Sequence, residues 1–149
     1  MEILNAKILL IDDEPDILEI LSTILMRENF HVDMALGGEE GLKKLSENQY
    51  DVVVCDFCMP KIDGIRLLTM VREMKSFMPF IFFSGNAVES HEIKMVNLGA
   101  YQLVPKTDIM KLPVILKNTL KHNEEVKKMN KDENQMSIDF LKILHSTEK

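Results

Sequence analysis

The sequence predicts an α/β domain built on a parallel β-sheet. Short apolar runs alternate with longer segments in which apolar residues recur every three or four positions, the pattern of repeated β-α-β units. Four of the apolar runs are followed at once by a reactive polar side chain. The carboxyl ends of parallel strands share one edge of the sheet, where α/β folds build their sites. The two observations together therefore predict one shared site at that edge.

The expected elements follow one another in regular order. The apolar runs predict strands at 6–11, 30–35, 51–55, 79–83 and 101–105. Apolar residues at helical spacing predict helices at 15–25, around 42–45, and at 67–74, 86–97 and 114–120. Pro15 suits the first turn of its helix, Gly99 fits the end of the fourth helix, and Pro113 lies near the start of the fifth or kinks it.

The segment after residue 122 has a different composition. Residues 122–135 are polar and rich in both charges, which fits a continued helix or a linker. The apolar residues of 136–145 share one helical face that Ser137 could cap, which predicts a short amphipathic helix. This helix could fold back on its own domain, bind a partner or a second copy, or be a frayed tail. We therefore expect a domain over 1–122 and a C-terminal helical extension over 123–149. The residues of the apolar face are Met136, Phe140, Leu141, Ile143 and Leu144.

Composition excludes several classes of function. A net charge of −6 and an isoelectric point of about 5.2 argue against non-specific nucleic-acid binding. No apolar run approaches a membrane span, and the acidic N-terminus does not fit a signal peptide. Cys55 and Cys58 form a C-x-x-C pair, but no second ligand pair completes a zinc site, and Cys55 falls inside a strand. We expect a buried strand cysteine, a loop cysteine and a reducing cytoplasmic location.

The polar groups after the strands are three carboxylates, a hydroxyl and an ammonium: Asp12, Asp13, Asp56, Ser84 and Lys106. Mg²⁺ prefers carboxylate oxygens, so Asp13 and Asp56 are the expected direct ligands, with Asp12 binding through water or adjusting the charge. An Asp carboxylate can also attack phosphorus to form an acyl phosphate. Mg²⁺, Lys106 and Ser84 would stabilise the transferring group. Each residue alone also fits a helix cap, a turn or a surface position. Their joint placement on four strand ends indicates phosphoryl transfer.

Several segments resemble the receiver domain of bacterial two-component response regulators, including the single-domain, CheY-like chemotaxis type. The segments are Ile8 to Pro15, Asp56 to Gly64, Ser84-Gly85, and Gly99-Ala100 seven residues before Lys106. The resemblance covers about residues 5–122. It implies a flavodoxin-like (βα)5 three-layer sandwich whose parallel five-stranded sheet has the order 2-1-3-4-5.

The same resemblance implies a role for each site residue. Asp56 would accept a phosphoryl group from a histidine kinase or a histidine phosphotransfer protein. Ser84 and Lys106 would hold the phosphoryl oxygens. The implied Mg²⁺ site consists of Asp12, Asp13, Asp56 and the main-chain carbonyl of Cys58.

The resemblance also implies how a signal leaves the domain. Phosphorylation would draw Ser84 inward and repack the face made by the fourth helix, the fifth strand and the fifth helix, where a downstream protein would bind. The sequence departs from the family pattern at two places on this route. Leu103 stands where an aromatic residue is usual, with Tyr101 on the same strand face as a candidate substitute. The family usually has Lys-Pro, whereas this chain has Pro105-Lys106-Thr107.

Three functions are compatible with these residues. The leading hypothesis is a phosphoacceptor switch that signals through protein contacts and is not a turnover enzyme. The 27 residues after His122 are too few for a typical DNA-binding domain and lack a basic helix. A phosphohydrolase with an Asp nucleophile would need an acid two residues after Asp56, where Cys58 stands. The third hypothesis is a receiver-like interaction module that does not switch. It stays open because the region around Leu103 and Pro105-Lys106-Thr107 departs from the family pattern.

Overall fold

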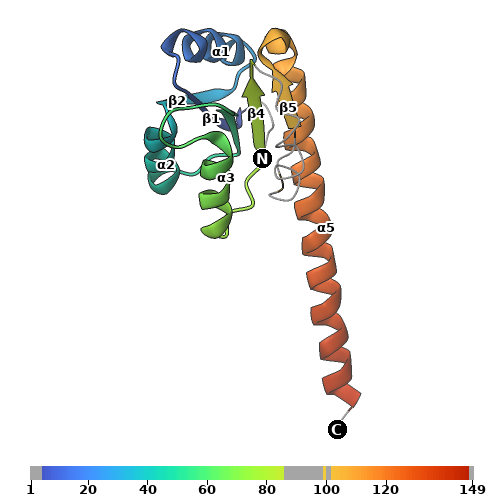
Figure 1. Ribbon diagram of the computed structural model, residues 1–149. Helices are drawn as coiled ribbons and strands as arrows, with labels where there is room; N and C mark the ends of the chain where they lie inside the picture. Colours follow the sequence, from blue (N-terminus) through green and yellow to red (C-terminus); the bar gives the residue numbers. More distant parts are fainter. Residues whose placement is uncertain (1–4, 86–98, 100–101, 148–149) are drawn as a thin grey trace.

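The computed structural model describes residues 5–85, 99 and 102–147, and these residues contain one five-stranded sheet (Figure 1). Neighbouring strands are parallel, in the order β2-β1-β3-β4-β5. The strands are β1 Lys7–Asp12, β2 His31–Leu36, β3 Val52–Asp56, β4 Phe80–Ser84 and β5 Gln102–Pro105. The predicted α/β fold and the implied strand order are therefore confirmed.

Within the part of the chain that the structure describes, a helix follows each of β1, β2, β3 and β5, as predicted. The helices are α1 Pro15–Arg27, α2 Gly38–Glu47, α3 Gly64–Glu73, the 3₁₀-helix η3 Lys106–Lys111, and α5 Leu112–Thr147. Pro15 occupies the first turn of α1, as predicted. The helix predicted at 86–97 and Tyr101 lie outside the described residues. Among the described residues, none of the helices combines the length and apolarity that crossing a membrane requires.

The sheet lies between two layers of helices because successive side chains of a strand point to opposite faces. In β1, Ile8 and Leu10 pack in one core cluster with residues of α1 and α5. Leu9 and Ile11 pack in the other cluster with residues of α2 and α3. Every residue of β3 and β4 is buried. Since both faces of these strands are covered, their sequences are apolar up to the last residue instead of alternating.

Three strands end one residue later than the apolar pattern predicts. The last residues of β1, β3 and β4 are Asp12, Asp56 and Ser84, and all three are buried. The apolar pattern reports which side chains enter the core. Hydrogen bonding between parallel strands depends on backbone groups, so it continues past the last apolar side chain. The sheet backbone itself therefore holds these three polar residues in place.

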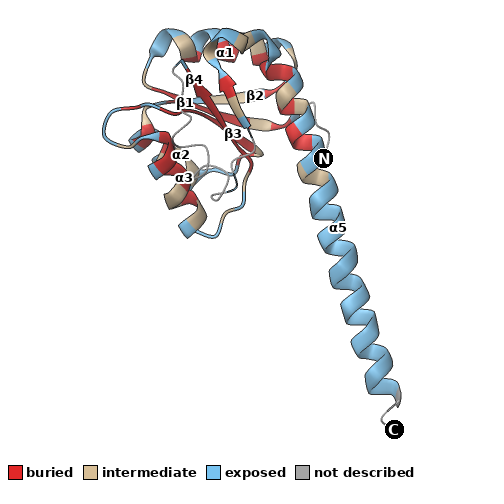
Figure 2. Cartoon of the chain, turned by 45° about the vertical axis from the view of Figure 1, so that its right-hand side comes forward, coloured by how far each residue is buried: buried red, intermediate tan, exposed pale blue. Residues whose placement is uncertain are grey.

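The C-terminal region is one continuous helix of 36 residues, α5. Residues 122–135 continue the helix, which was the first of the two alternatives for this segment. After Pro113 the segment has no glycine or proline to interrupt the helix, and its opposite charges at helical spacing are compatible with it. The described residues 125–146 are all exposed, and the helix projects away from the domain instead of folding back on it (Figure 2).

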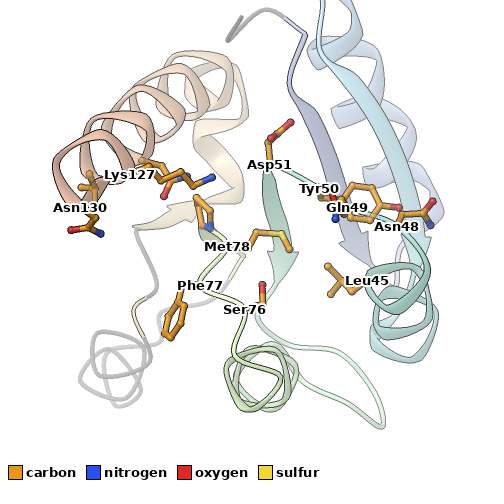
Figure 3. A pocket seen from close by; sticks show the side chains of 13 residues that line it. Leu45, Asn48, Gln49, Tyr50, Asp51, Ser76, Phe77, Met78, Lys127 and Asn130 are labelled. Carbon is orange, nitrogen blue, oxygen red and sulfur yellow. The ribbon is translucent and has the colours of Figure 1, made fainter. Parts of the chain in front are cut away.

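A groove of about 750 Å³ lies between the start of the sheet strands and α5 (Figure 3). Tyr50 and Met78, which precede β3 and β4, line one side, and Asn123, Val126 and Lys127 of α5 line the other. The groove is therefore at the amino edge of the parallel strands, away from the edge that carries the predicted site.

Leu116→Ala in α5 should lower the free energy of unfolding by about 2–5 kcal/mol, because this side chain is fully buried in the core cluster shared with α1. Val114 lies on the same helix but is 60% exposed, so Val114→Ala is the matched control and should cost less than about 1 kcal/mol. Urea denaturation measures both. Equal losses for the two variants would show that α5 does not close this layer of the core.

Candidate functional site

The strand register brings the predicted site residues to one edge of the sheet. Asp12 ends β1 and Asp56 ends β3. Asp56 pairs with Phe83, directly before Ser84, and Ser84 pairs with Pro105, directly before Lys106. The carboxylates, the hydroxyl and the ammonium therefore lie along the carboxyl ends of β1, β3, β4 and β5, as the sequence predicted.

The ammonium of Lys106 connects carboxylates from three parts of the chain. Its Nζ lies 3.2 Å from Oδ2 of Asp56, 3.4 Å from Oδ2 of Asp12 and 3.5 Å from Oε1 of Glu14. The Asp12 and Asp56 side chains are only 2% and 5% exposed. The stem of Lys106 passes beside Gly85, where an added Cβ would lie 3.6 Å from its Cδ. Burial limits screening by water, so the contacts with Asp12 and Asp56 are stronger than ion pairs at the surface, whereas the Glu14 side chain is 61% exposed.

Two backbone N–H groups fix the orientation of the buried carboxylates. The N–H of Glu14 donates to Oδ1 of Asp12 at 2.9 Å. The N–H of Cys58 donates to Oδ1 of Asp56 at 3.3 Å. Each donor lies two residues after its acceptor, so the turn that follows the strand supplies the bond. The second oxygen of each carboxylate is then left to face Lys106.

The loop after β3 is held against the site by a close backbone contact. The N–H of Gly64 donates to the carbonyl of Phe57 at 3.0 Å. A Cβ on Gly64 would lie 2.8 Å from the carbonyl oxygen of Asp56 and 2.6 Å from the ring of Phe82, so the position requires glycine. The Asp63 carboxylate caps α3 by accepting from the N–H of Arg66 at 2.8 Å.

The site has more negative charge than Lys106 neutralises. Burial raises the pKa of the Asp12 carboxyl to about 6, and the charge of Asp56 adds to the rise, whereas the Glu14 N–H and Lys106 oppose it. Burial also raises the pKa of Asp56, against the attraction of Lys106. For Lys106, burial lowers the pKa, but Asp12 and Asp56 together outweigh it and raise the pKa above its usual value. A second cation in this site would therefore be stabilised.

The residues present fit a divalent cation. Carboxylate oxygens of Asp12, Asp13, Glu14 and Asp56 lie within 4.8 Å of one another. Oδ2 of Asp12 is buried and accepts no hydrogen bond from the described residues, although the Lys106 ammonium lies nearby. A buried oxygen in this state is suited to a metal, and the all-oxygen donor set is the one that Mg²⁺ prefers.

Glu14 is the member of the cluster that the sequence interpretation did not include as a ligand. Its position in the acidic run directly after Asp12-Asp13 was the available signal. Leu103, at the other end of the site, is partly buried against the core cluster that contains Phe80 and Phe82. The cysteine prediction is confirmed, because Cys55 is a buried free thiol and Cys58 an exposed one.

Comparison with known proteins identifies the family. The model of the response regulator receiver domain family matches residues 8–117, which is most of the chain. The chain belongs to this family. The resemblance inferred from the sequence motifs is therefore confirmed, and with it a place among two-component response regulators, which act as signalling switches.

Curated relatives of this receiver domain are longer proteins. The chain is 34% identical over 103 residues to the alkaline phosphatase synthesis transcriptional regulatory protein PhoP of Bacillus subtilis, covering 69% of this chain and 43% of that protein. It is 36% identical over 101 residues to the transcriptional regulatory protein CpxR homolog of Haemophilus influenzae, covering 68% of this chain and 44% of that protein. The chain thus spans less than half the length of these two relatives.

Solved receiver domains have the same fold. A CheY-like receiver domain protein from Methanospirillum hungatei superposes with a TM-score of 0.77 at 26% identity, covering 81% of this chain and 98% of that one. The response regulator TrrA of Thermotoga maritima, solved in complex with Mg²⁺ and BeF, gives a TM-score of 0.70 at 30% identity, covering 76% of this chain and 98% of that one. These structures agree with the strand order and helix layers described above.

Asp12→Asn should stabilise the metal-free receiver domain at pH 7. The pKa of Asp12 rises from its usual 3.8 to about 6 on folding, so the folded state is penalised progressively between about pH 4 and pH 6 and fully above that range. Asparagine removes the penalty, which is about 1–3 kcal/mol at pH 7 and small at pH 4.

Thermal unfolding in EDTA at the two pH values measures the gain, with the exposed Asp132→Asn as the control. If Asp12→Asn were no more stable than the control at pH 7, the inferred cost of burying the charged Asp12 carboxylate would be wrong.

Proposed function

We propose that this receiver domain is a phosphoacceptor switch in which Asp56 receives a phosphoryl group from a histidine kinase or a histidine phosphotransfer protein. The 3.2 Å contact between Nζ of Lys106 and Oδ2 of Asp56 supports the proposal most directly. A partly buried cation beside a carboxylate is the partner that a transferred phosphoryl group requires. The edge position leaves Asp56 within reach of a donor that approaches the ends of the strands.

The proposed transfer is an in-line displacement at phosphorus. A carboxylate oxygen of Asp56 bonds to phosphorus while the bond from phosphorus to the donor nitrogen breaks, and the electron pair leaves with the donor imidazole. The new acyl phosphate brings additional negative charge into the site. Lys106 would turn from the carboxylate to a phosphoryl oxygen, and the Ser84 hydroxyl would donate to another.

Asp12, Asp13, Asp56 and the main-chain carbonyl of Cys58 are the proposed ligands of Mg²⁺. When bound, the ion neutralises charge on the carboxylates and on the transferring phosphoryl group. The hydrogen bond from the Cys58 N–H to Asp56 keeps this part of the loop beside the nucleophile. Glu14 adds a further carboxylate that could hold a water of the ion.

The proposed output is protein contact, without nucleic acid or membrane as a partner. A downstream protein would bind the face that includes β5 and the first half of α5, in keeping with the family resemblance. A reducing cytoplasmic location is part of the proposal, since both cysteines are free thiols. Turnover of a small phosphate ester is not expected, because Cys58 stands where a phosphohydrolase of this kind has its acid.

A receiver-like module that binds partners without switching is the second candidate. Leu103 favours it, because this β5 side chain is anchored against the core and has little freedom to report a change at Ser84. Such a module would have equal partner affinity with and without phosphorylation.

Asp56→Asn should abolish phosphoryl uptake. The chain is incubated with Mg²⁺ and acetyl phosphate, and intact mass is recorded. The wild type and the surface control Asp132→Asn should each gain one phosphoryl group, whereas Asp56→Asn should gain none, because an amide is a poor nucleophile. Equal labelling of Asp56→Asn would refute the assignment of the acceptor.

Lys106→Met should strengthen Mg²⁺ binding while weakening phosphoryl uptake. Removing the ammonium takes away a competing positive charge within 3.5 Å of three carboxylates, so the Mg²⁺ dissociation constant should fall by about tenfold. Isothermal titration calorimetry measures it, with Lys111→Met as the control, because the Lys111 side chain is 72% exposed. Unchanged or weaker Mg²⁺ binding in Lys106→Met would place the ion elsewhere.

A further inference from the structure

The second half of α5 carries an apolar stripe that the domain leaves exposed apart from Val126, which lies partly in the groove beside Tyr50 and Met78. Its large residues recur at alternate spacings of three and four, with Glu133 at the one polar position between them. This is the spacing of the core positions in a two-helix coiled coil. The stripe consists of Val126, Met129, Met136, Phe140 and Ile143, which are 36%, 63%, 72%, 61% and 61% exposed.

The stripe begins where the domain ceases to support the helix. Leu112, Leu116 and Leu120 pack in the core, whereas the described residues 125–146 are all exposed (Figure 2). Most of the stability of a helix in a protein comes from packing of its apolar face, and the domain does not supply that packing to this segment. In a symmetric dimer, both copies use the same surface, so the stripe of one copy could pack against the stripe of the other. We propose that a second copy of this chain packs along the stripe, with the two helices antiparallel.

Glu133 decides the orientation. In a parallel pair, the Glu133 side chains of the two copies would face each other inside the contact. Two like charges brought together away from water are strongly unfavourable. In an antiparallel pair, Glu133 instead faces Met136 of the second copy, and its carboxylate can reach solvent past that flexible side chain.

Antiparallel pairing also matches the remaining stripe residues with one another. Val126 faces Ile143 of the second copy, and Met129 faces Phe140 of the second copy, so each large side chain meets another. In one chain, the second half of α5 extends away from the tip of β4 (Figure 1). The two domains of an antiparallel pair would therefore lie at opposite ends, with both phosphoacceptor edges open.

The charges beside the stripe oppose this arrangement only weakly. Asp132 comes near Asp139 of the second copy, but both are exposed. Lys128 and Lys142 lie one helical turn from them along the sequence. Repulsion between exposed charges of this kind costs at most about 0.5 kcal/mol for each pair. This is less than the cost of a buried Glu133 pair, so the antiparallel arrangement is preferred.

The stripe predicts a weak, reversible dimer. Aromatic side chains bury roughly 150–250 Å², so five half-exposed residues bring roughly 100 Å² each and roughly 1,000 Å² for the two copies. That area is at the low end of specific interfaces. We therefore expect a dissociation constant of roughly micromolar size and a concentration-dependent mass.

Sedimentation velocity of the full chain at several concentrations tests the pairing. The wild type should change from one chain to two as the concentration rises through roughly the micromolar range. Phe140→Ser should raise the dissociation constant at least about tenfold. Ile138→Ser is the matched control and should leave it unchanged, because Ile138 is 46% exposed but lies outside the stripe.

Phenylalanine, isoleucine and serine have similar helix propensities, so the two variants should keep equal helix content by circular dichroism. A wild type that stays monomeric throughout, or equal weakening by the two variants, would overturn the proposal. Phosphoryl uptake by Phe140→Ser should match the wild type, which separates this test from that of the switch.

Cross-linking tests the orientation. Chains carrying Val126→Cys and chains carrying Ile143→Cys, both with Cys58→Ser, are mixed and oxidised. Antiparallel pairing brings position 126 of one copy next to position 143 of the other, so it should give the mixed disulfide between the two variants. Cys55 is buried and does not compete for oxidation. Disulfides joining two identical variants would show parallel helices and overturn the antiparallel arrangement.

Discussion

The contact of Lys106 with Asp12 and Asp56 is the constraint on which the rest of this site depends. It joins the ends of β1 and β3 to the residue after β5, so it forms only when the whole sheet has its observed order. The single ammonium does not neutralise all the carboxylates of the site, and it only partly opposes the burial that raises the pKa of Asp12 and of Asp56. A site in this state favours an additional cation, and this preference connects the fold to the proposed chemistry.

Backbone groups make that electrostatic arrangement rigid. The N–H groups of Glu14 and Cys58 hold one oxygen of each buried carboxylate, and the close approach of Gly64 to the Asp56 carbonyl holds the loop. Backbone donors fixed by turns have little freedom to reorganise when charge arrives. The acceptor is therefore oriented before any donor or metal binds.

Helix α5 combines two environments in one element. Its first turns complete the core through Leu112, Leu116 and Leu120, whereas its second half presents apolar residues to solvent. From about Val126 onward, the apolar residues of α5 lie on a different side of the helix from the residues that face the domain. Val126 also lines the groove between α5 and the sheet that Figure 3 shows. A partner bound to the second half of α5 would therefore contact the same unbroken helix that packs against the domain with Asp56.

The sequence by itself determined the strands, the helices of the described residues and the edge at which the reactive residues meet. Apolar periodicity reports burial, and parallel strands share one carboxyl edge. It left open whether residues 122–135 were helix or linker, because charged segments fit both, and it missed Glu14 in the carboxylate cluster. Tertiary structure decided these points, together with the raised pKa of Asp12, since distances and burial depend on residues far apart in the chain. The exposure of the stripe on α5 also depends on the tertiary structure, because a local sequence pattern does not show which part of a helix the domain covers.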